Sequence, residues 1–229
     1  MDLNSNLMQR VIVDSASLSW IESPSPGVSR RMLERDGGEM PHRATTIVRY
    51  KADSSFSEHT HDLGEEFIVL DGVFSDESGD YGVGMYVRNP PGSHHRPFTR
   101  EGCQIFVKLR QFSPVDNNVV RIDTRSTAWL QTAFEGQWIM PLYRRDGRDP
   151  EYVSLRKWSP GVRLGQHEYP GGEELLVLEG SFSDEYGHYP KGTWLRNPAG
   201  SSHQPYSVDG CVLYMKTGHL PCAMPPQEI

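Results

Sequence analysis

A long segment of this sequence occurs twice, and the second copy begins 108 residues after the first. The copies keep the same charged and turn positions, so that Glu65-Glu66 aligns with Glu173-Glu174 and Arg88-Asn89-Pro90 aligns with Arg196-Asn197-Pro198. A period this long that occurs only twice indicates duplication of a whole domain, because solenoid repeats are shorter and more numerous. We therefore predict two tandem domains, residues 1–113 and residues 114–229.

Short apolar runs separated by turn residues predict an all-β fold for each copy. Residues 44–50, 103–109 and 152–158 are such runs, and Pro90-Pro-Gly92 and Pro198-Ala-Gly200 are typical turns. No window of a dozen residues shows a convincing 3.6-residue apolar period. We expect a sandwich or barrel of strands with little helix.

The composition excludes several function classes. The net charge is −7 and Lys and Arg do not cluster, so we expect no contact with nucleic acid. No apolar run approaches the roughly 20 residues of a membrane span, and the first residues lack the apolar core of a signal peptide, so we expect a cytoplasmic protein. Cys103 and Cys211 occupy equivalent positions in apolar runs and are expected to be buried thiols.

The first copy carries four side chains that suit a metal ion. His59 and His61 lie two residues apart, and residues i and i+2 of a strand point to the same face about 6 to 7 Å apart. Glu65 follows a turn and begins an apolar run, and His95 follows the turn at 90–92. Three imidazoles and one carboxylate form a nitrogen and oxygen site that suits zinc, with iron, manganese, nickel or copper as alternatives.

The second copy keeps three of the four candidate ligands: His167, Glu173 and His203. Tyr169 replaces the second histidine of the pair. We therefore consider two interpretations of this copy: a metal site with three ligands, or a former metal site in which Tyr169 fills the vacant place. Tyr169 is also a candidate for a fourth ligand or for a hydrogen bond to a bound substrate.

These spacings resemble the two signature motifs of the cupin superfamily. In the first copy, the motifs read His59-x-His61-x3-Glu65-x6-Gly72 and Gly84-x5-Pro90-x-Gly92-x2-His95. In the second copy, they read Gly161-x5-His167-x-Tyr169-x3-Glu173-x6-Gly180 and Gly192-x5-Pro198-x-Gly200-x2-His203. The resemblance covers nearly the whole chain. It implies two tandem cupin domains, each a double-stranded β-helix or jelly roll, that together form a bicupin.

More narrowly, the runs Glu65–Glu77 and Glu173–Glu185 resemble the cupin part of ChrR-type anti-sigma factors. In that family, a zinc-binding cupin follows a helical module that binds a sigma factor and takes part in transcription regulation during oxidant stress. That module has its own His and Cys zinc ligands, whereas this chain has no Cys before Cys103 and no helical pattern in its first forty residues. The resemblance therefore implies a link to a sigma-factor system without the sigma-binding module itself.

Two functions from different classes follow from this resemblance. The first is a regulatory or sensory bicupin that holds zinc as a structural or ligand-responsive centre, with a small molecule as a candidate ligand at the metal. The second is an iron-dependent dioxygenase that acts on a small carbonyl or diketone substrate. Decarboxylation or isomerisation, known in other bicupins, is a third option, for which the sequence identifies no acid/base residue. The sequence leaves homodimer formation open.

Overall fold

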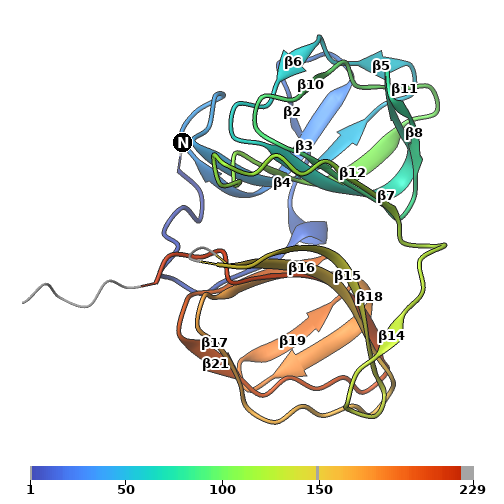
Figure 1. Ribbon diagram of the computed structural model, residues 1–229. Coiled ribbons are helices and arrows are strands. Elements are labelled where there is room, and N and C mark those ends of the chain that lie inside the picture. The colour runs from blue at the N-terminus through green and yellow to red at the C-terminus, as the bar shows by residue number, and fades with distance from the viewer. Residues whose placement is uncertain (1, 148–149, 223–229) are drawn as a thin grey trace, which may run out of the picture. The chain divides into compact units, whose positions relative to one another are not determined.

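The structure is a computed structural model that describes residues 2–147 and 150–222, and its elements are strands apart from one short 3-10 helix. The described chain forms two compact units (Figure 1). The first unit contains the residues up to Ser5 together with Leu18–Thr127. The second unit contains Asn6–Ser17 together with the residues from Ala128 onward. Both are barrels of antiparallel strands, which confirms the predicted all-β fold class.

The strands of the first unit follow the repeat in chain order. They are β2 (Ile21–Glu22), β3 (Val28–Asp36), β4 (Arg43–Tyr50), β5 (Ser54–Ser55), β6 (His59–Thr60), β7 (Glu65–Asp76), β8 (Gly79–Gly82), β9 (Met85–Asn89), β10 (His94–His95), β11 (Phe98–Thr99), β12 (Cys103–Leu109) and β13 (Val120–Asp123). The main sheet has the order β13-β9-β7-β12-β4-β3-β2, and β6 pairs with β10 in a separate two-stranded sheet. All of these pairs are antiparallel.

The second unit repeats this arrangement. Its elements are β1 (Val11–Asp14), η1 (Ser15–Ser17), β14 (Leu130–Gln131), β15 (Gln137–Arg145), β16 (Glu151–Trp158), β17 (His167–Tyr169), β18 (Glu173–Asp184), β19 (Gly187–Pro190), β20 (Thr193–Asn197), β21 (Ser201–His203) and β22 (Cys211–Thr217). The main sheet has the order β1-β20-β18-β22-β16-β15-β14, and β17 pairs with β21.

The first strand of each sequence copy belongs to the unit built from the other copy. β1 pairs with β20, with Val11 opposite Arg196, and β13 pairs with β9, with Val120 opposite Arg88. The compact units therefore differ from the sequence boundary between residues 113 and 114, because strand pairing draws β1 into the second unit and β13 into the first.

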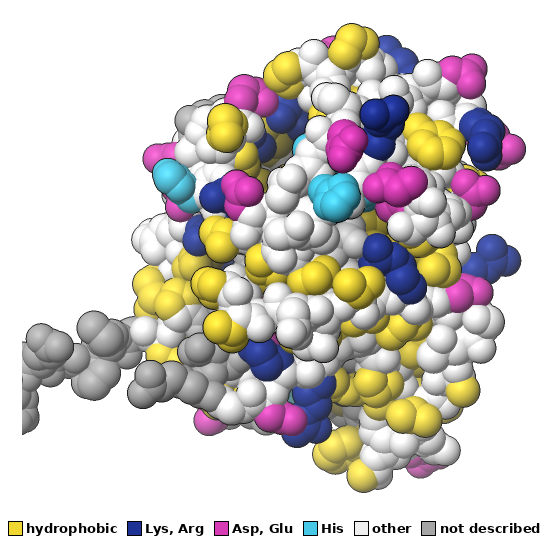
Figure 2. Space-filling model, turned by 45° about the horizontal axis from the view of Figure 1, so that its top comes forward, with side chains coloured by type: hydrophobic (Ala, Val, Ile, Leu, Met, Phe, Trp, Pro, Cys, Tyr) yellow, Lys and Arg dark blue, Asp and Glu magenta, His cyan; other side chains and the backbone are white. Residues whose placement is uncertain are grey.

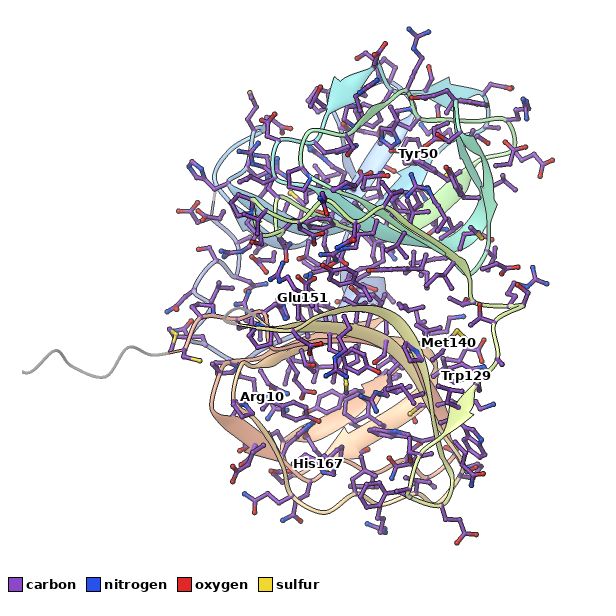
Figure 3. All side chains as sticks on the ribbon, viewed as in Figure 1. Arg10, Tyr50, Trp129, Met140, Glu151 and His167 are labelled. Atoms are coloured by element: carbon purple, nitrogen blue, oxygen red, sulfur yellow. The ribbon has the colours of Figure 1, made fainter. Side chains whose placement is uncertain are left out.

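Alternation along the strands builds the core of each barrel. In β12, Cys103, Ile105 and Val107 are two residues apart and join one buried cluster with residues such as Val48 and Phe67. Cys103 and Cys211 are both buried, as predicted. Figure 3 shows Tyr50 among the side chains of the first barrel and His167 among those of the second.

The longest strand of each unit, β7 in the first and β18 in the second, bends at a glycine. Gly72 in β7 has φ of +67°, and a Cβ built there would lie 2.0 Å from the carbonyl oxygen of Gly102. Gly180 in β18 has φ of +65° and the same close approach to Gly210, at 2.1 Å. Beyond Gly72, β7 leaves the main sheet and pairs with β8 and β11. A residue without a side chain is therefore required where the strand changes partners.

We expect Gly72→Ala to destabilise the first barrel by at least about 2 kcal/mol, because alanine adds both left-handed backbone strain and a clash with backbone. Gly82→Ala is the matched control: Gly82 lies in the neighbouring β8, its φ is not positive, and a Cβ there meets nothing within 4 Å. Thermal and urea unfolding of both variants measure the difference. Equal stability of the two variants would show that the bend does not depend on glycine.

Candidate metal centre

A two-stranded sheet brings the first and the last candidate ligand together. β6 and β10 are antiparallel, and their register places His95 directly opposite His59. His61 follows β6 and makes two backbone hydrogen bonds to residues 92 and 93: its N–H donates to Ser93 at 2.8 Å, and its carbonyl accepts from Gly92 at 2.9 Å. Turn residues 90–92, predicted from sequence, therefore fix the position of His61 as well as that of His95.

The four predicted ligands of the first copy converge on one point. One ligand atom from each of His59, His61, Glu65 and His95 lies within 4.8 Å of all the others. The imidazole centroids of the three histidines are 4.7 to 5.0 Å apart. In the part of the chain that the structure describes, this is the one group of three or more His, Cys, Asp or Glu side chains gathered in this way.

Neighbouring groups hold the imidazole rings in a ligating orientation. The Nδ1 atom of His95 lies 3.1 Å from the Asp76 carboxylate, and Nδ1 of His59 lies 3.0 Å from the carbonyl oxygen of Ser57. Each contact favours a proton on Nδ1, so that the lone pair of Nε2 points to the centre. The side-chain amide of Asn89 donates to Glu65 Oε2 at 3.0 Å and orients that carboxylate.

The spacing of the buried atoms fits a divalent ion. The Nε2 atoms of His61 and His95 are buried and make no hydrogen bond to the described residues, and they lie 3.5 and 3.6 Å from Oε2 of Glu65. Bonds of about 2.1 Å in a tetrahedral site place neighbouring ligand atoms about 3.4 Å apart. Buried nitrogen lone pairs at this separation from a carboxylate are costly without a cation between them. The His3Glu group could therefore bind a divalent metal ion.

The pKa values of the two buried histidines differ. Burial lowers the pKa of His61, because the charged form is penalised, and this favours the neutral imidazole that a metal requires. Burial also lowers the pKa of His95, but the hydrogen bond to Asp76 and the charge of Glu65 outweigh it and raise the pKa overall.

The second barrel keeps the strand pairing of the first, but its candidate ligands do not converge on one point. His203 lies opposite His167 in the pairing of β17 with β21, and His203 Nδ1 lies 2.9 Å from Asp184. However, Nε2 of His203 lies only 3.0 Å from the Glu173 carboxylate, in a direct ion pair. Tyr169 takes the position of His61, and burial together with the charge of Glu173 raises the Tyr169 pKa.

One oxygen of Glu173 is engaged by protein groups. Its Oε1 lies 3.0 Å from Nε2 of His203 and accepts a hydrogen bond of 2.6 Å from the side-chain amide of Asn197, whereas Oε2 is buried and makes no hydrogen bond to the described residues. His167 binds the carbonyl oxygen of Gly165 through Nδ1 and does not join Glu173 and His203 in a cluster of ligand atoms among the residues described. Both sequence interpretations of this copy, a metal site with three ligands and a former metal site in which Tyr169 fills the vacant place, stay predictions.

Sequence reasoning missed the residues that orient the ligands. Asp76 and Asp184 contact the Nδ1 atoms of His95 and His203. Asn89 and Asn197 donate to Oε2 of Glu65 and Oε1 of Glu173, the same oxygens that lie nearest the histidine Nε2 atoms. Both pairs are identical in the two copies, and this identity was the available signal. Arg88 pairs with Glu66 at 2.8 Å and with Asp116 at 2.7 Å, so that its guanidinium links the hairpin to two carboxylates.

The ion pairs of His203 predict a pH dependence of stability. Burial lowers the pKa of His203, but Asp184 and Glu173 outweigh it and raise the pKa from 6.5 to about 9. Because the folded pKa lies above the unfolded one, the stabilisation is fully present below pH 6.5 and is lost as pH rises through about 9. Thermal unfolding from pH 6 to pH 10 should show this loss in the wild type and a smaller loss in His203→Gln. An NMR titration midpoint of His203 at or below 6.5 would contradict the ion-pair assignment.

Comparison with known proteins places this geometry in a family. The family model described as the ChrR cupin-like domain matches the chain twice, over residues 8–113 and 117–221. No curated protein matches the sequence. No helix among the described residues is long and apolar enough to cross a membrane.

Solved structures with a similar fold cover nearly the whole chain. A candidate dioxygenase from Nostoc punctiforme is 15% identical, covers 95% of this chain and 88% of its own, and has a TM-score of 0.75. Protein Ylba from E. coli is 15% identical, with 96% and 95% covered and a TM-score of 0.70. A mutant of Bacillus subtilis oxalate decarboxylase is 13% identical, with 96% and 79% covered and a TM-score of 0.62. These likenesses show the fold, and the two family matches show that the chain belongs to the ChrR cupin-like family, with two tandem copies of its domain.

Proposed function

We propose that this protein is a regulatory or sensory bicupin that holds one divalent ion, zinc in the first place, in its first barrel. The observation that carries the proposal is the convergence of His59, His61, Glu65 and His95, three of them buried, on one point. Four protein ligands complete the coordination of a tetrahedral zinc ion and leave it no open position. Such a closed centre suits a structural role, or a sensor in which an incoming molecule must displace a ligand.

His59 is the ligand best placed to respond to such a molecule. Its side chain is more exposed than those of the other three, and among the described residues its ring is hydrogen-bonded to the backbone carbonyl of Ser57, whereas His95 is held by a carboxylate. The regulatory proposal includes a small-molecule ligand at this side of the centre, a link to a sigma-factor system and a location in the cytoplasm. Figure 2 shows basic and acidic side chains intermixed on one face, a pattern that does not favour nucleic acid as a partner.

The second candidate is a metal-dependent dioxygenase that acts on a small carbonyl or diketone substrate. An iron ion in the same His3Glu group would supply Lewis acidity and a site for oxygen chemistry, with coordination that extends beyond four. The exposure of His59 on one side of the centre favours this candidate, since substrate requires access there. The similar fold of the Nostoc punctiforme candidate dioxygenase keeps this activity under consideration.

Elemental analysis of protein purified without oxygen and without a chelating tag tests the proposal. We expect about one zinc per chain, which is lost in His59→Ala and retained in His167→Ala. His94→Ala is the matched control, because His94 precedes His95 in β10 but is exposed and lies outside the ligand group.

Each other result has a definite meaning. Iron in place of zinc, together with oxygen uptake on a diketone such as acetylacetone, would favour the dioxygenase over the sensor. Metal that survives in His59→Ala but is lost in His167→Ala would contradict the assignment of the site to the first barrel.

A further inference from the structure

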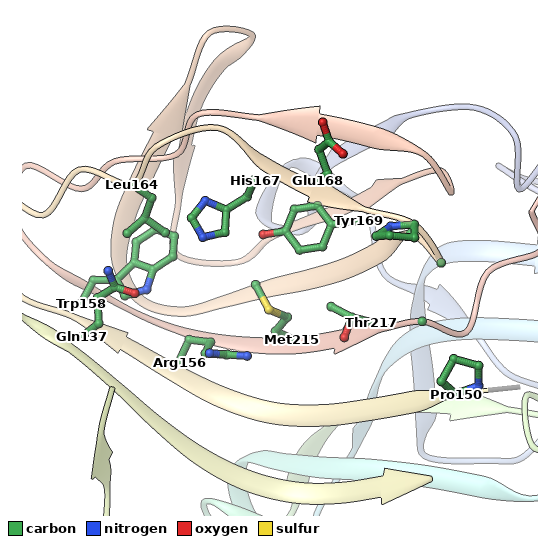
Figure 4. A pocket seen from close by; sticks show the side chains of 14 residues that line it. Gln137, Pro150, Arg156, Trp158, Leu164, His167, Glu168, Tyr169, Met215 and Thr217 are labelled. Carbon is green, nitrogen blue, oxygen red and sulfur yellow. The ribbon is translucent and has the colours of Figure 1, made fainter. Parts of the chain in front are cut away.

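The second barrel contains a cavity that the first-barrel chemistry does not explain. Its volume is about 420 Å³, within the range of small-molecule sites. Figure 4 shows Arg156 and Met215 on one wall, and His167 and Tyr169 on the facing wall. Glu168 also lines the rim, but its carboxylate points away from the space between these walls (Figure 4).

The lining of this cavity is polar at positions where the first barrel is apolar. Strand pairing aligns Arg156 with Val48, since Arg156 lies opposite Leu213 and Val48 lies opposite the equivalent Ile105. By the same registers, Gln137 takes the place of Val28 and Thr217 takes the place of Leu109. Val28 and Val48 belong to the buried core of the first barrel, and Leu109 packs against it. The second copy has therefore lost a ligand at Tyr169 and gained a cation, an amide and a hydroxyl inside its barrel.

Some hydrogen-bond donors of Arg156 are not used within the described part of the protein. Its Nε donates to the Ser154 hydroxyl at 3.2 Å, and its Nη groups make no hydrogen bond or ion pair with the described residues. The one carboxylate at longer range, Glu173, is already paired with His203. Burial lowers the pKa of Arg156, although arginine stays charged at neutral pH. Arg156 is half-buried, so its Nη groups, which have no carboxylate partner among the described residues, are placed to bind an anion that enters the cavity.

The other lining residues indicate the chemistry of the rest of the ligand. Trp158, Leu164 and Met215 give it an apolar wall, and the ring of Tyr169 faces them. Gln137 and Thr217 add neutral hydrogen-bonding groups. A planar guanidinium binds a carboxylate through two parallel hydrogen bonds. We infer that the second barrel is a binding site for a small organic carboxylate with an apolar body, held by Arg156 and independent of any metal.

Titration calorimetry with benzoate and hexanoate tests this inference on the full-length protein with its native metal content. We expect one carboxylate to bind per chain, and Arg156→Val to weaken that binding by at least about tenfold, because a charge-assisted pair is lost. Valine is the residue that the first barrel holds at the equivalent position, so this variant is expected to fold, and Arg156→Gln, which stays polar, serves as a second variant. Melting curves verify that both are folded.

Three controls separate this site from others. Arg163→Val removes an exposed arginine of the same unit, one that stacks on Tyr206 and does not line the cavity, and should leave binding unchanged. Benzamide, the neutral counterpart of benzoate, should bind equally to wild type and Arg156→Val. His59→Ala should also bind benzoate as the wild type does.

Failure of both carboxylates to bind at millimolar concentration would overturn the inference, and so would equal binding by the wild type and both Arg156 variants. Binding lost in His59→Ala and kept in Arg156→Val would place the carboxylate at the first-barrel centre. That result would overturn this inference while it supports the metal proposal, so the two are distinguishable.

Discussion

The candidate metal centre depends on one strand that curls far enough for its two ends to meet the same imidazole ring. Glu65 begins β7 and Asp76 ends it, and both contact His95, at 3.6 Å from Nε2 and 3.1 Å from Nδ1. An extended strand from residue 65 to residue 76 spans about 36 Å at about 3.3 Å per residue. The strand therefore has to curl back, and the bend at Gly72 is where it changes sheet partners. The ligand set and its orienting carboxylate are thus consequences of barrel closure.

The same curl in the second barrel supports a different interior. Glu173 and Asp184, at the two ends of β18, again meet one histidine, at 3.0 and 2.9 Å. Oε1 of Glu173 contacts Nε2 of His203 and the side-chain amide of Asn197, so that this oxygen is engaged within the protein. The retained residues therefore have different contacts in the two barrels. His95 lies beside the candidate ligand Glu65 in the first barrel, whereas His203 forms an ion pair with Glu173 in the second. After duplication, the two barrels have different interiors. The first brings the candidate metal ligands together, and the second contains a cavity lined by Arg156.

Much of this could be predicted from the sequence because ligand spacing and strand alternation are local. The positions of His59, His61, Glu65 and His95 follow from the i, i+2 geometry of a strand and from turns marked by Pro and Gly. The orienting roles of Asp76 and Asn89 were marked in the sequence only by the identity of these residues with Asp184 and Asn197, since each role depends on contacts between separate strands or across a bend. The sequence also did not show that β1 joins the second unit and β13 joins the first, because an edge strand has the same alternation whichever sheet it joins. The change from Val48 to Arg156 is visible in the aligned copies, but only the barrel shows that the position faces inward.

The most direct test of the account is anomalous X-ray diffraction from crystals of the full-length protein, recorded above and below the absorption edge of the metal that elemental analysis identifies. We predict one anomalous peak per chain, within about 2.0 to 2.3 Å of ligand atoms from His59, His61, Glu65 and His95, and no peak within bonding distance of His203. A peak bonded to His203 and Glu173, or a metal-containing protein with no peak among the first four ligands, would contradict it.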